Sequence, residues 1–356
     1  MKKYKYCCIG AGGVAWHKHL PGYSALGNVE ICAISDINES AFGRFLEKYP
    51  GIRTYTDYNE MLAVEKPDIV SICTPNKFHL PMTIDAFKAG AHVHCEKPMA
   101  MNEAEAVDMI AARDDYGKEL MIGLNNRFTN EAFFVKDYIE NGHLGEIYYA
   151  RCGWRRRRGI PGMGGWFTQK ALSGGGPLID LGVHMIDLSM YMMSCPEPVT
   201  VSASTYRKFE GCETRSMGFD PEKKGIFDVE DLAVGFVRFD NNASLSFEVS
   251  FAMNNEEEKW FYELFGTKGG VKYEKGKLVI FSEMNDTLVD IYPDTNYKTK
   301  ALNEFAHFID VIENRADSIS PPEDARKMMR LIEAAYRSAD TGRETIYNAK
   351  PKTPDS

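Results

Sequence analysis

The sequence predicts an α/β protein of two domains, with a doubly wound parallel sheet first and an antiparallel or mixed sheet second. The chain has 356 residues, enough for about two domains of ordinary size. Its first third alternates short apolar runs with amphipathic helical patterns, which is typical of a parallel sheet. Later apolar runs adjoin one another without intervening helices, which favours antiparallel or mixed pairing. We therefore predict domains at residues 1–124 and 125–356.

In the first domain the apolar runs predict five parallel strands, joined by short right-handed crossovers. The expected strands are Tyr4–Ile9, Val29–Ile34, Ile69–Cys73, His92–Cys95 and Glu119–Leu124. Helical patterns between them include Ala41–Tyr49, Pro81–Ala89 and Glu103–Tyr116.

The second domain is expected to begin with a helix, Glu131–Asn141, a strand, Glu146–Trp154, and an apolar helix, Pro177–Met193. Six further strands are expected at Val199–Tyr206, Glu230–Phe239, Ser244–Phe251, Trp260–Phe265, Lys277–Phe281 and Thr287–Ile291. Two C-terminal helices, about Leu302–Glu313 and Pro322–Ala339, should cover one face of this sheet.

Composition narrows the class of partner. Lys and Arg total 42 against 51 Asp and Glu, a net charge of −9, which disfavours nucleic acid and anionic membranes as partners. No segment approaches the ~18 uninterrupted apolar residues of a membrane span. The start, Met1-Lys2-Lys3-Tyr4, carries no apolar signal region, and the eight cysteines form no CxxC pair. We expect a cytoplasmic protein with reduced, buried thiols.

The first strand ends in Gly10-Ala11-Gly12-Gly13-Val14-Ala15, which fits the GxGxxG/A fingerprint of dinucleotide-binding sites. In that fingerprint the first glycine makes a tight turn and the second lets the backbone approach a pyrophosphate. Asp36 ends the second strand, 21 positions after Ala15. A carboxylate at this position accepts a hydrogen bond from the ribose 2′-OH and repels a 2′-phosphate. No Arg directly follows it, so NAD is favoured over NADP. A plain glycine turn with Asp36 as a helix cap is the alternative.

Two further turns follow predicted strands at the edge of the sheet where ligands of open α/β sheets bind. Thr74-Pro75-Asn76 follows the third strand, and Glu96-Lys97-Pro98 follows the fourth. Taken singly, a Thr-Pro-Asn sequence is typical of an ordinary turn, and a Glu-Lys pair on a loop is typical of charged side chains in contact with solvent. Their shared location makes both candidates for ligand contacts.

The helix Pro177–Met193 is apolar almost all round, yet it carries Asp180, His184 and Asp187 at i, i+4 and i+7. At 100° per residue these three side chains share one face. A buried carboxylate beside an imidazole is costly unless it is paired or used. The pattern favours a catalytic Asp180–His184 pair over a core histidine. A metal site is a further alternative, but no second His motif supports it, and we expect none.

These motifs together resemble the glucose-fructose oxidoreductase / inositol dehydrogenase / rhizopine-catabolism (Gfo/Idh/MocA) family. The resemblance spans nearly the whole chain and rests on GAGGVA with Asp36, TPNKFH (residues 74–79), EKP (96–98), GLNNRF (123–128) and GGGPLIDLGVHMIDL (174–188). It implies an N-terminal Rossmann domain and an α+β C-terminal domain with a large open, mostly antiparallel sheet. In this family the outer face of that sheet commonly forms the oligomer interface, which implies a homodimer or homotetramer.

The resemblance also assigns roles to residues. Lys97, Asp180 and His184 match the family's catalytic set, and the peptide before Pro98 is often cis in such proteins. The implied cofactor contacts are Gly10, Gly12, Gly13, Val14, Asp36, Thr74, Pro75, Asn76, His79, Glu96 and Lys97. The implied substrate contacts include Lys97, Asp180 and His184.

The loop after Trp154 departs from the family signature. It contains four consecutive arginines, Arg155 to Arg158, and then Trp166. Side chains of a strand alternate between faces, so at most two of these arginines face one surface. Arg155 and Trp166 are candidate substrate contacts, with surface ion pairs and core packing as the alternatives.

The implied activity is hydride transfer between a secondary hydroxyl of a sugar, cyclitol or related polyol and NAD. His184 would accept the hydroxyl proton, Asp180 would orient the imidazole, and Lys97 would hold the developing alkoxide. Two alternatives stay open: an NAD-dependent glycoside-cleaving enzyme that acts through a transient keto sugar, and a non-catalytic regulatory protein that responds to NAD or sugar.

Overall fold

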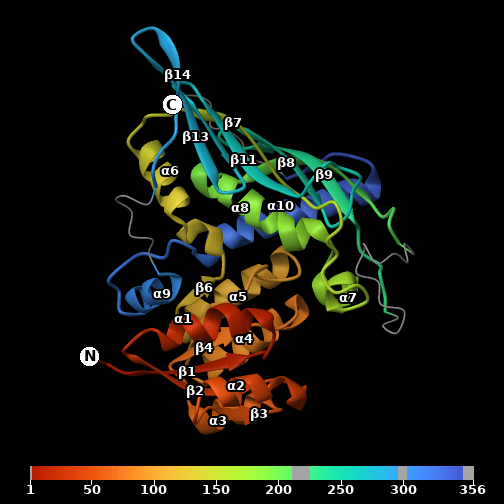
Figure 1. Cartoon of the computed structure of the whole chain (residues 1–356). Coiled ribbons are helices and arrows are strands. Elements are labelled where there is room, and N and C mark those ends of the chain that lie inside the picture. The colour runs from red at the N-terminus through yellow and green to blue at the C-terminus, as the bar shows by residue number, and fades with distance from the viewer. Residues whose placement is uncertain (1, 211–224, 296–302, 348–356) are drawn as a thin grey trace. The chain divides into compact units, whose positions relative to one another are not determined.

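The computed structural model describes residues 2–210, 225–295 and 303–347 (Figure 1). The chain forms two compact units. The first comprises Met1–Phe128 and Leu302–Arg326, and the second comprises Thr129–Ala301 and Lys327–Ser356. Each unit is described by itself.

The first unit is built on a parallel sheet, as the sequence predicts, and the sheet has six strands, one more than the five expected. Its strands are β1 (Tyr4–Ile9), β2 (Val29–Ser35), β3 (Arg53–Tyr55), β4 (Ile69–Ile72), β5 (His92–Cys95) and β6 (Leu120–Ile122). Their order across the sheet is β3-β2-β1-β4-β5-β6. This is the order of the Rossmann fold, in which ligands bind at the carboxyl ends of the strands where the order reverses, between β1 and β4.

Helices connect these strands. A helical stretch over residues 13–24 contains η1 (Ala15–His19) and α1 (Leu20–Ser24), and it is followed by α2 (Gly43–Lys48), α3 (Tyr58–Glu65), α4 (His79–Lys88) and α5 (Glu103–Tyr116). The bounds of α5 agree with the prediction because both ends are marked: Asn102 caps the start by accepting the backbone N–H of Glu105, and Gly117 ends the helix at a φ of 58°. The prediction did not include β3 and α3, which are short.

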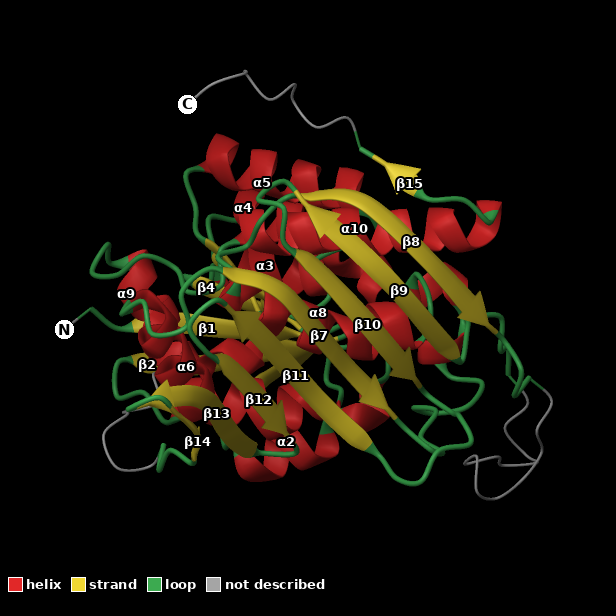
Figure 2. Cartoon of the chain, turned by 90° about the horizontal axis from the view of Figure 1, so that it is seen from above, coloured by secondary structure: helices red, strands yellow, loops and turns green. Residues whose placement is uncertain are grey.

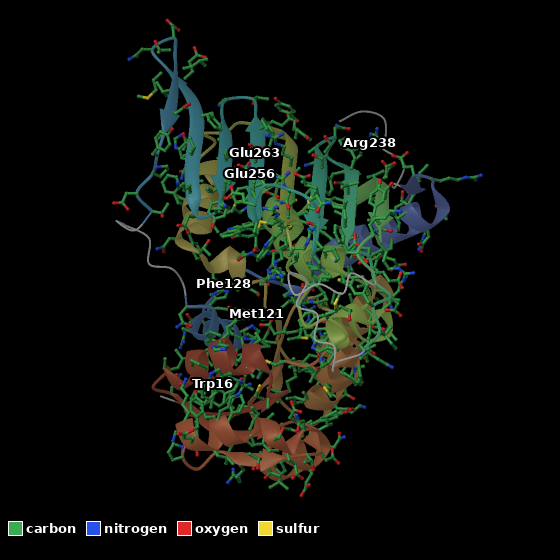
Figure 3. The ribbon with its side chains drawn as sticks, turned by 45° about the vertical axis from the view of Figure 1, so that its right-hand side comes forward. Trp16, Met121, Phe128, Arg238, Glu256 and Glu263 are labelled. Carbon is green, nitrogen blue, oxygen red and sulfur yellow. The ribbon has the colours of Figure 1, made fainter. Side chains whose placement is uncertain are left out.

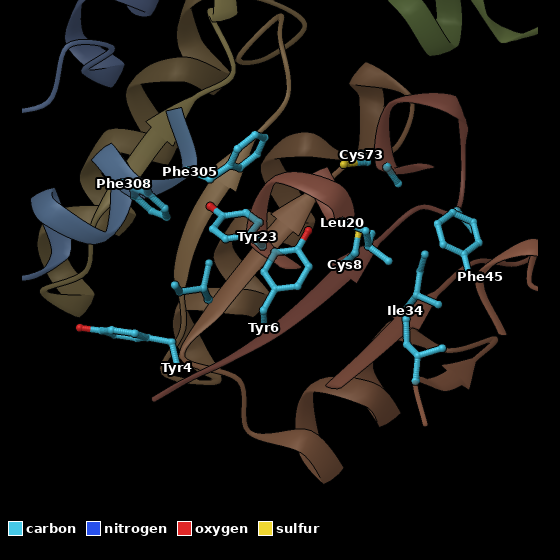
Figure 4. Packing of buried hydrophobic residues seen from close by; sticks show 14 of the residues in the cluster. Tyr4, Tyr6, Cys8, Leu20, Tyr23, Ile34, Phe45, Cys73, Phe305 and Phe308 are labelled. Carbon is cyan, nitrogen blue, oxygen red and sulfur yellow. The ribbon is translucent and has the colours of Figure 1, made fainter. Parts of the chain in front are cut away.

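The C-terminal helix α9 (Glu304–Ile312) belongs to the core of the first unit. Phe305 and Phe308 from α9 join the buried cluster that contains Tyr6 and Tyr23 (Figure 4). This corrects the expectation that both C-terminal helices cover the second sheet. The physical reason is that α9 has an apolar face, and the first sheet and the helix after β1 together cover this face.

The second unit contains a nine-stranded mixed sheet. Its strands are β7 (Ile147–Arg155), β8 (Pro198–Tyr206), β9 (Leu232–Phe239), β10 (Ser244–Ser250), β11 (Lys259–Gly266), β12 (Gly270–Glu274), β13 (Lys277–Met284), β14 (Thr287–Ile291) and β15 (Thr345–Ile346). The order is β14-β13-β12-β11-β7-β10-β9-β8-β15. The β7–β10 pair is parallel and its neighbours pair antiparallel, so the predicted mostly antiparallel sheet is confirmed.

Helices α8 (Val183–Met192) and α10 (Pro322–Thr341) lie behind this sheet in the view of Figure 2, and the other face stays open. On β7 the buried side chains Ala150 and Cys152 alternate with Arg151, which pairs with Glu263 of β11. Arg238 of β9 and Glu263 are labelled in Figure 3. The remaining helices of this unit are α6 (Asn130–Glu140) and α7 (Lys170–Ser173).

Two further observations concern expectations from the sequence. Among the described residues no helix is both long and apolar enough to cross a bilayer. Seven cysteines are free and buried, and the eighth, Cys212, lies outside the described residues.

If α9 completes the core of the first unit, truncating Phe308 must destabilise it. Phe308 is 0% exposed, so we expect Phe308→Ala to lower the free energy of unfolding by about 3–5 kcal/mol through lost burial and a residual cavity. Leu288→Ala is the control, because Leu288 is 85% exposed and should change this free energy by less than ~0.5 kcal/mol. Denaturant titration measures both, and equal effects would place α9 outside the core.

Candidate active site

The loop between β1 and the next helix has the geometry that a dinucleotide fingerprint requires. Gly10 has a φ of +100°, and a Cβ there would lie 2.5 Å from the carbonyl oxygen of Cys73 at the end of β4, so only glycine fits. Gly12 and Gly13 are exposed, and a Cβ on either would meet nothing within 4 Å. The backbone of the loop is therefore open to the approach of a pyrophosphate at the start of the helical stretch.

Asp36 lies beside this loop with a fixed carboxylate. Its Oδ2 accepts the backbone N–H of Ala11 at 2.7 Å, and its Oδ1 accepts that of Asn38 at 2.9 Å. The half-buried carboxylate at the end of β2 fits the ribose 2′-OH of NAD and disfavours a 2′-phosphate.

Arg44 of α2 also touches the glycine loop, which no sequence motif indicated. Its Nη2 donates to the carbonyl oxygens of Ala11 and Gly12 at 2.8 and 3.0 Å. Because α2 is placed by tertiary packing, the short sequence pattern around Asp36 contains no signal for this contact.

A buried network of charged and polar groups stands under the Glu96-Lys97-Pro98 turn. The Oε1 of Glu96 accepts from Nζ of Lys18 at 3.1 Å and from Nε2 of His19 at 2.8 Å. Lys18 also pairs with Oε1 of Glu304 on α9 at 3.2 Å, and Nε2 of His94 lies 3.2 Å from the same oxygen. These groups come from three segments far apart in the sequence.

The charges in this network determine its protonation. Burial disfavours the ionised carboxyl of Glu96, but the Lys18 ammonium and the hydrogen bond from His19 outweigh it and hold the pKa of Glu96 well below its usual value. The same balance lowers the pKa of Glu304 to about 2. Burial lowers the pKa of His19 to about 4, so this ring is neutral at pH 7. Its Nε2–H donates to Glu96, and Nδ1 accepts from Oγ of Ser71 at 2.8 Å.

This network also holds Lys97. The second oxygen of Glu96, Oε2, accepts the backbone N–H of Lys97 at 3.3 Å, and the side chain of Lys97 is half-buried. The Lys97–Pro98 peptide is cis, as the resemblance implied. The buried Glu96 thus fixes the backbone of Lys97, while the Lys97 side chain remains partly exposed to solvent.

His79 lies where two of the predicted turns meet. Its Nδ1 is 2.7 Å from the carbonyl oxygen of Pro98, and its Nε2 is 3.0 Å from that of Thr74. Burial lowers its pKa, so the neutral ring donates to one of these carbonyls at a time. The ring is 0% exposed and links the two turns, and the cofactor contact that the resemblance implied stays a prediction. Thr74 and Pro75 are half-buried and Asn76 is buried.

In the second unit the helix that carries Asp180 and His184 begins with a π-helical turn, η6 (Leu178–Gly182), and continues as α8. The sequence analysis placed Asp180, His184 and Asp187 on one face by assuming 100° per residue along the whole helix. In the π turn the hydrogen bonds run from i to i+5, so the rotation per residue is smaller there. Asp180 and His184 remain about one turn apart and are half-buried, whereas Asp187 is buried. Single π turns inside helices occur frequently at functional sites.

A carboxylate fixes the start of this helix. Glu230 accepts the backbone N–H groups of Gly176 at 2.9 Å and Leu178 at 3.1 Å, and the hydroxyl of Tyr336 donates to it at 2.9 Å. Burial raises the pKa of Glu230 although these three donors favour its ionised form. A Cβ on Gly175 would lie 2.0 Å from the Tyr336 hydroxyl, which explains a glycine at this position. Sequence reasoning did not identify Glu230, because its partners are more than fifty residues away.

His184 has an aromatic neighbour on β7. The ring centroids of Trp154 and His184 are 5.7 Å apart, with an angle of 50° between the rings. Trp154 therefore faces α8, and Arg155, the next residue of the strand, faces the open side of the sheet. There Arg155 pairs with Glu248 at 3.3 Å. This ion pair is one of the alternatives that the sequence left open for Arg155, and its contact with a substrate stays a prediction.

The other expected residues fall as follows. Trp166 stacks on Phe167 with ring centroids 3.7 Å apart, in a loop of the same unit as His184. Lys97 belongs to the first unit, and Asp180 and His184 belong to the second. Within residues 2–210, 225–295 and 303–347, no group of three or more His, Cys, Asp or Glu side chains is arranged to hold a metal ion.

Comparison with known proteins agrees with these features. Residues 4–124 match the profile of an oxidoreductase family with an NAD-binding Rossmann fold, and residues 134–272 match that of the GFO/IDH/MocA C-terminal domain. D-glucoside 3-dehydrogenase of Escherichia coli (strain K12) is 34% identical over 336 residues, which cover 94% of this chain and 95% of that protein.

Two solved structures are also similar. The aldose-aldose oxidoreductase from Caulobacter crescentus, complexed with glycerol, is 25% identical with a TM-score of 0.80, and the match covers 97% of this chain and all of that one. A levoglucosan dehydrogenase in complex with NADH is 21% identical with a TM-score of 0.83, over 97% of this chain and 99% of that one. At 21% identity, the similarity to the levoglucosan dehydrogenase shows a shared fold only.

The buried network predicts that the protein loses stability in acid. Between pH 6.5 and 4 the unfolded chain protonates His19 while the folded chain does not, and between about pH 4.5 and 2 the same holds for Glu304. Because the unfolded state binds more protons in both windows, the free energy of unfolding falls as pH falls, by up to about 1.4 kcal/mol per pH unit for each group.

Glu304→Gln removes one of these groups, so the decline below pH 4.5 should become shallower in this variant. Glu47→Gln, on the exposed side of α2, is the matched control and should keep the slope of the parent protein. Denaturant titrations at several pH values give these slopes. An unchanged slope in Glu304→Gln would show that Glu304 does not contribute.

Proposed function

Since the chain belongs to the GFO/IDH/MocA family of NAD-binding oxidoreductases, we propose that it oxidises a secondary hydroxyl of a sugar, cyclitol or related polyol. A glucoside oxidised at C3 is the substrate we favour, because the relative with 34% identity over 94% of this chain is a D-glucoside 3-dehydrogenase. The observation that carries the proposal is that Asp180 and His184 are half-buried, about one turn apart, on a largely apolar helix.

In the proposed reaction His184 accepts the proton of the substrate hydroxyl. Asp180, about one helical turn away, orients the imidazole and stabilises the imidazolium that forms. The Lys97 ammonium donates a hydrogen bond to the same hydroxyl oxygen as negative charge develops on it. NAD, when bound, supplies the acceptor for the hydride that leaves the carbon. The glycine loop and Asp36 would hold its pyrophosphate and ribose.

The first experiment measures NADH absorbance with NAD, then NADP, over a panel of glucosides, aldoses, sugar acids and cyclitols. Turnover of glucosides with NAD supports the proposal. A preference for NADP would contradict the role of Asp36. Release of an aglycone without net NADH would favour glycoside cleavage, and NAD binding without any reaction would favour a regulatory protein.

Variants test the assigned roles. We expect His184→Ala and Lys97→Ala each to lose at least about 10²-fold in kcat, since general-base and oxyanion contacts are each worth that much. NAD should still bind to both, as measured by calorimetry. His143→Ala and Lys277→Ala are the matched controls, because both side chains are exposed. Near-normal turnover in a test variant would remove that residue from the mechanism.

We further propose that the protein is a homodimer or homotetramer in the cytoplasm. Seven free, buried cysteines suit a reducing compartment. The open sheet face carries Phe281, which is 43% exposed, and the same face of a second copy is a suitable cover.

Phe281→Asp should therefore lower the mass measured by light scattering toward that of one 40.2 kDa chain. Leu46→Asp is the control, because Leu46 is exposed on α2 in the other unit and should leave the mass unchanged. A monomeric parent protein would contradict the proposal directly.

A further inference from the structure

Trp154 is held in one orientation beside His184. The indole Nε1 donates to Oε1 of Glu258 at 2.9 Å, and the ring centroid lies 5.7 Å from that of His184. Trp260, its cross-strand neighbour on β11, lies 6.0 Å away, centroid to centroid. Trp154 is half-buried and packs partly against the buried cluster of Ile160, Leu181, Phe251 and Ala252, which holds its ring beside the imidazole.

Arg156 and Glu258 form a fixed donor and acceptor beside the Trp154 ring. Nε of Arg156 donates to the same Oε1 of Glu258 at 3.1 Å, and its Nη1 donates to the carbonyl oxygen of Gly159 at 3.1 Å. The guanidinium lies 5.2 Å from the centre of the Trp154 ring. Among the described residues, Oε2 of Glu258 and Nη2 of Arg156 have no hydrogen-bond partner. The Glu258 side chain is 46% exposed and that of Arg156 is 23% exposed, so both groups can be reached from solvent.

This combination has the chemistry of a carbohydrate subsite. An aromatic ring covers apolar C–H surface, while a few fixed polar groups set the orientation of the ligand. A carboxylate oxygen can accept from one hydroxyl of a sugar, while the planar guanidinium beside it donates to the neighbouring hydroxyl. The charges of Arg156 and Glu258 cancel, so the pair favours a neutral, hydroxyl-rich ring over a sugar acid or an amino sugar.

We propose that Trp154, Arg156 and Glu258 form a second sugar subsite, which binds the ring next to the one that is oxidised beside His184. This rests on the proposed function, and it specifies the substrate as a glycoside with a neutral sugar at the reducing side. The subsite contributes to binding of the second ring and takes no part in proton or hydride transfer.

Glu258→Gln tests the subsite by comparing a glucose disaccharide with methyl glucoside. Loss of a hydrogen bond to a charged group should raise KM for the disaccharide about 10-fold or more. For methyl glucoside, KM should stay within about 2-fold, and kcat should stay unchanged for both. Glu256→Gln is the matched control, because Glu256 (Figure 3) is also exposed, lies two residues earlier and contacts Arg157 only through its backbone oxygen. Equal changes for both substrates, or none, would overturn the subsite.

A binding measurement separates failure of the subsite from failure of the proposed function. Tryptophan fluorescence is titrated with the disaccharide and with methyl glucoside, in the parent protein and in Trp154→Phe, which keeps an aromatic ring. A dissociation constant for the disaccharide, fitted from these titrations, that rises in Trp154→Phe while that for methyl glucoside does not supports the subsite even where no glucoside is oxidised. The same response in both proteins, or none in the parent, would overturn it.

Discussion

The ammonium group of Lys18, buried between two carboxylates, is the interaction on which the first unit depends. Glu96 follows β5, Glu304 begins α9, and Lys18 belongs to the helix after the glycine loop. Removing one partner of a buried ion pair leaves an uncompensated charge, at a cost of about 3–5 kcal/mol. The three segments are therefore fixed together by charge. Since Glu96 also accepts the backbone N–H of Lys97, the position of Lys97 depends on the same network.

The second unit fixes its functional helix by a similar principle. Glu230 is buried, and backbone N–H groups at the helix start together with the Tyr336 hydroxyl satisfy its oxygens. The glycines before the helix let these partners approach, because a side chain there would collide with them. In both units a buried carboxylate sets the backbone of the segment that carries a candidate catalytic residue, while that residue itself stays half-exposed.

The sequence predicted the features that depend on local pattern. Periodicity located most strands, and the spacing of Gly10, Gly12 and Asp36 identified the dinucleotide loop. The sequence analysis did not identify Lys18, Glu230 or Glu304, because each of these residues contacts partners that are distant in the chain. The apolar face of α9 indicated that it must pack, but not against which sheet. The sequence did not show which of Arg155 to Arg158 face which side, because the alternation along β7 could not be phased before Trp154 was placed beside His184. The catalytic roles of Lys97, Asp180 and His184 stay predictions.

The central claim is that a hydride passes from a ring carbon of a glucoside to NAD. The most direct measurement uses a glucoside deuterated at C3 and determines by mass spectrometry where the deuterium goes. Hydride transfer from C3 leaves one deuterium in the reduced cofactor, and none when C2 or C4 carries the label. Deuterium that is released to the solvent, or that returns to the sugar without net reduction of NAD, would contradict it.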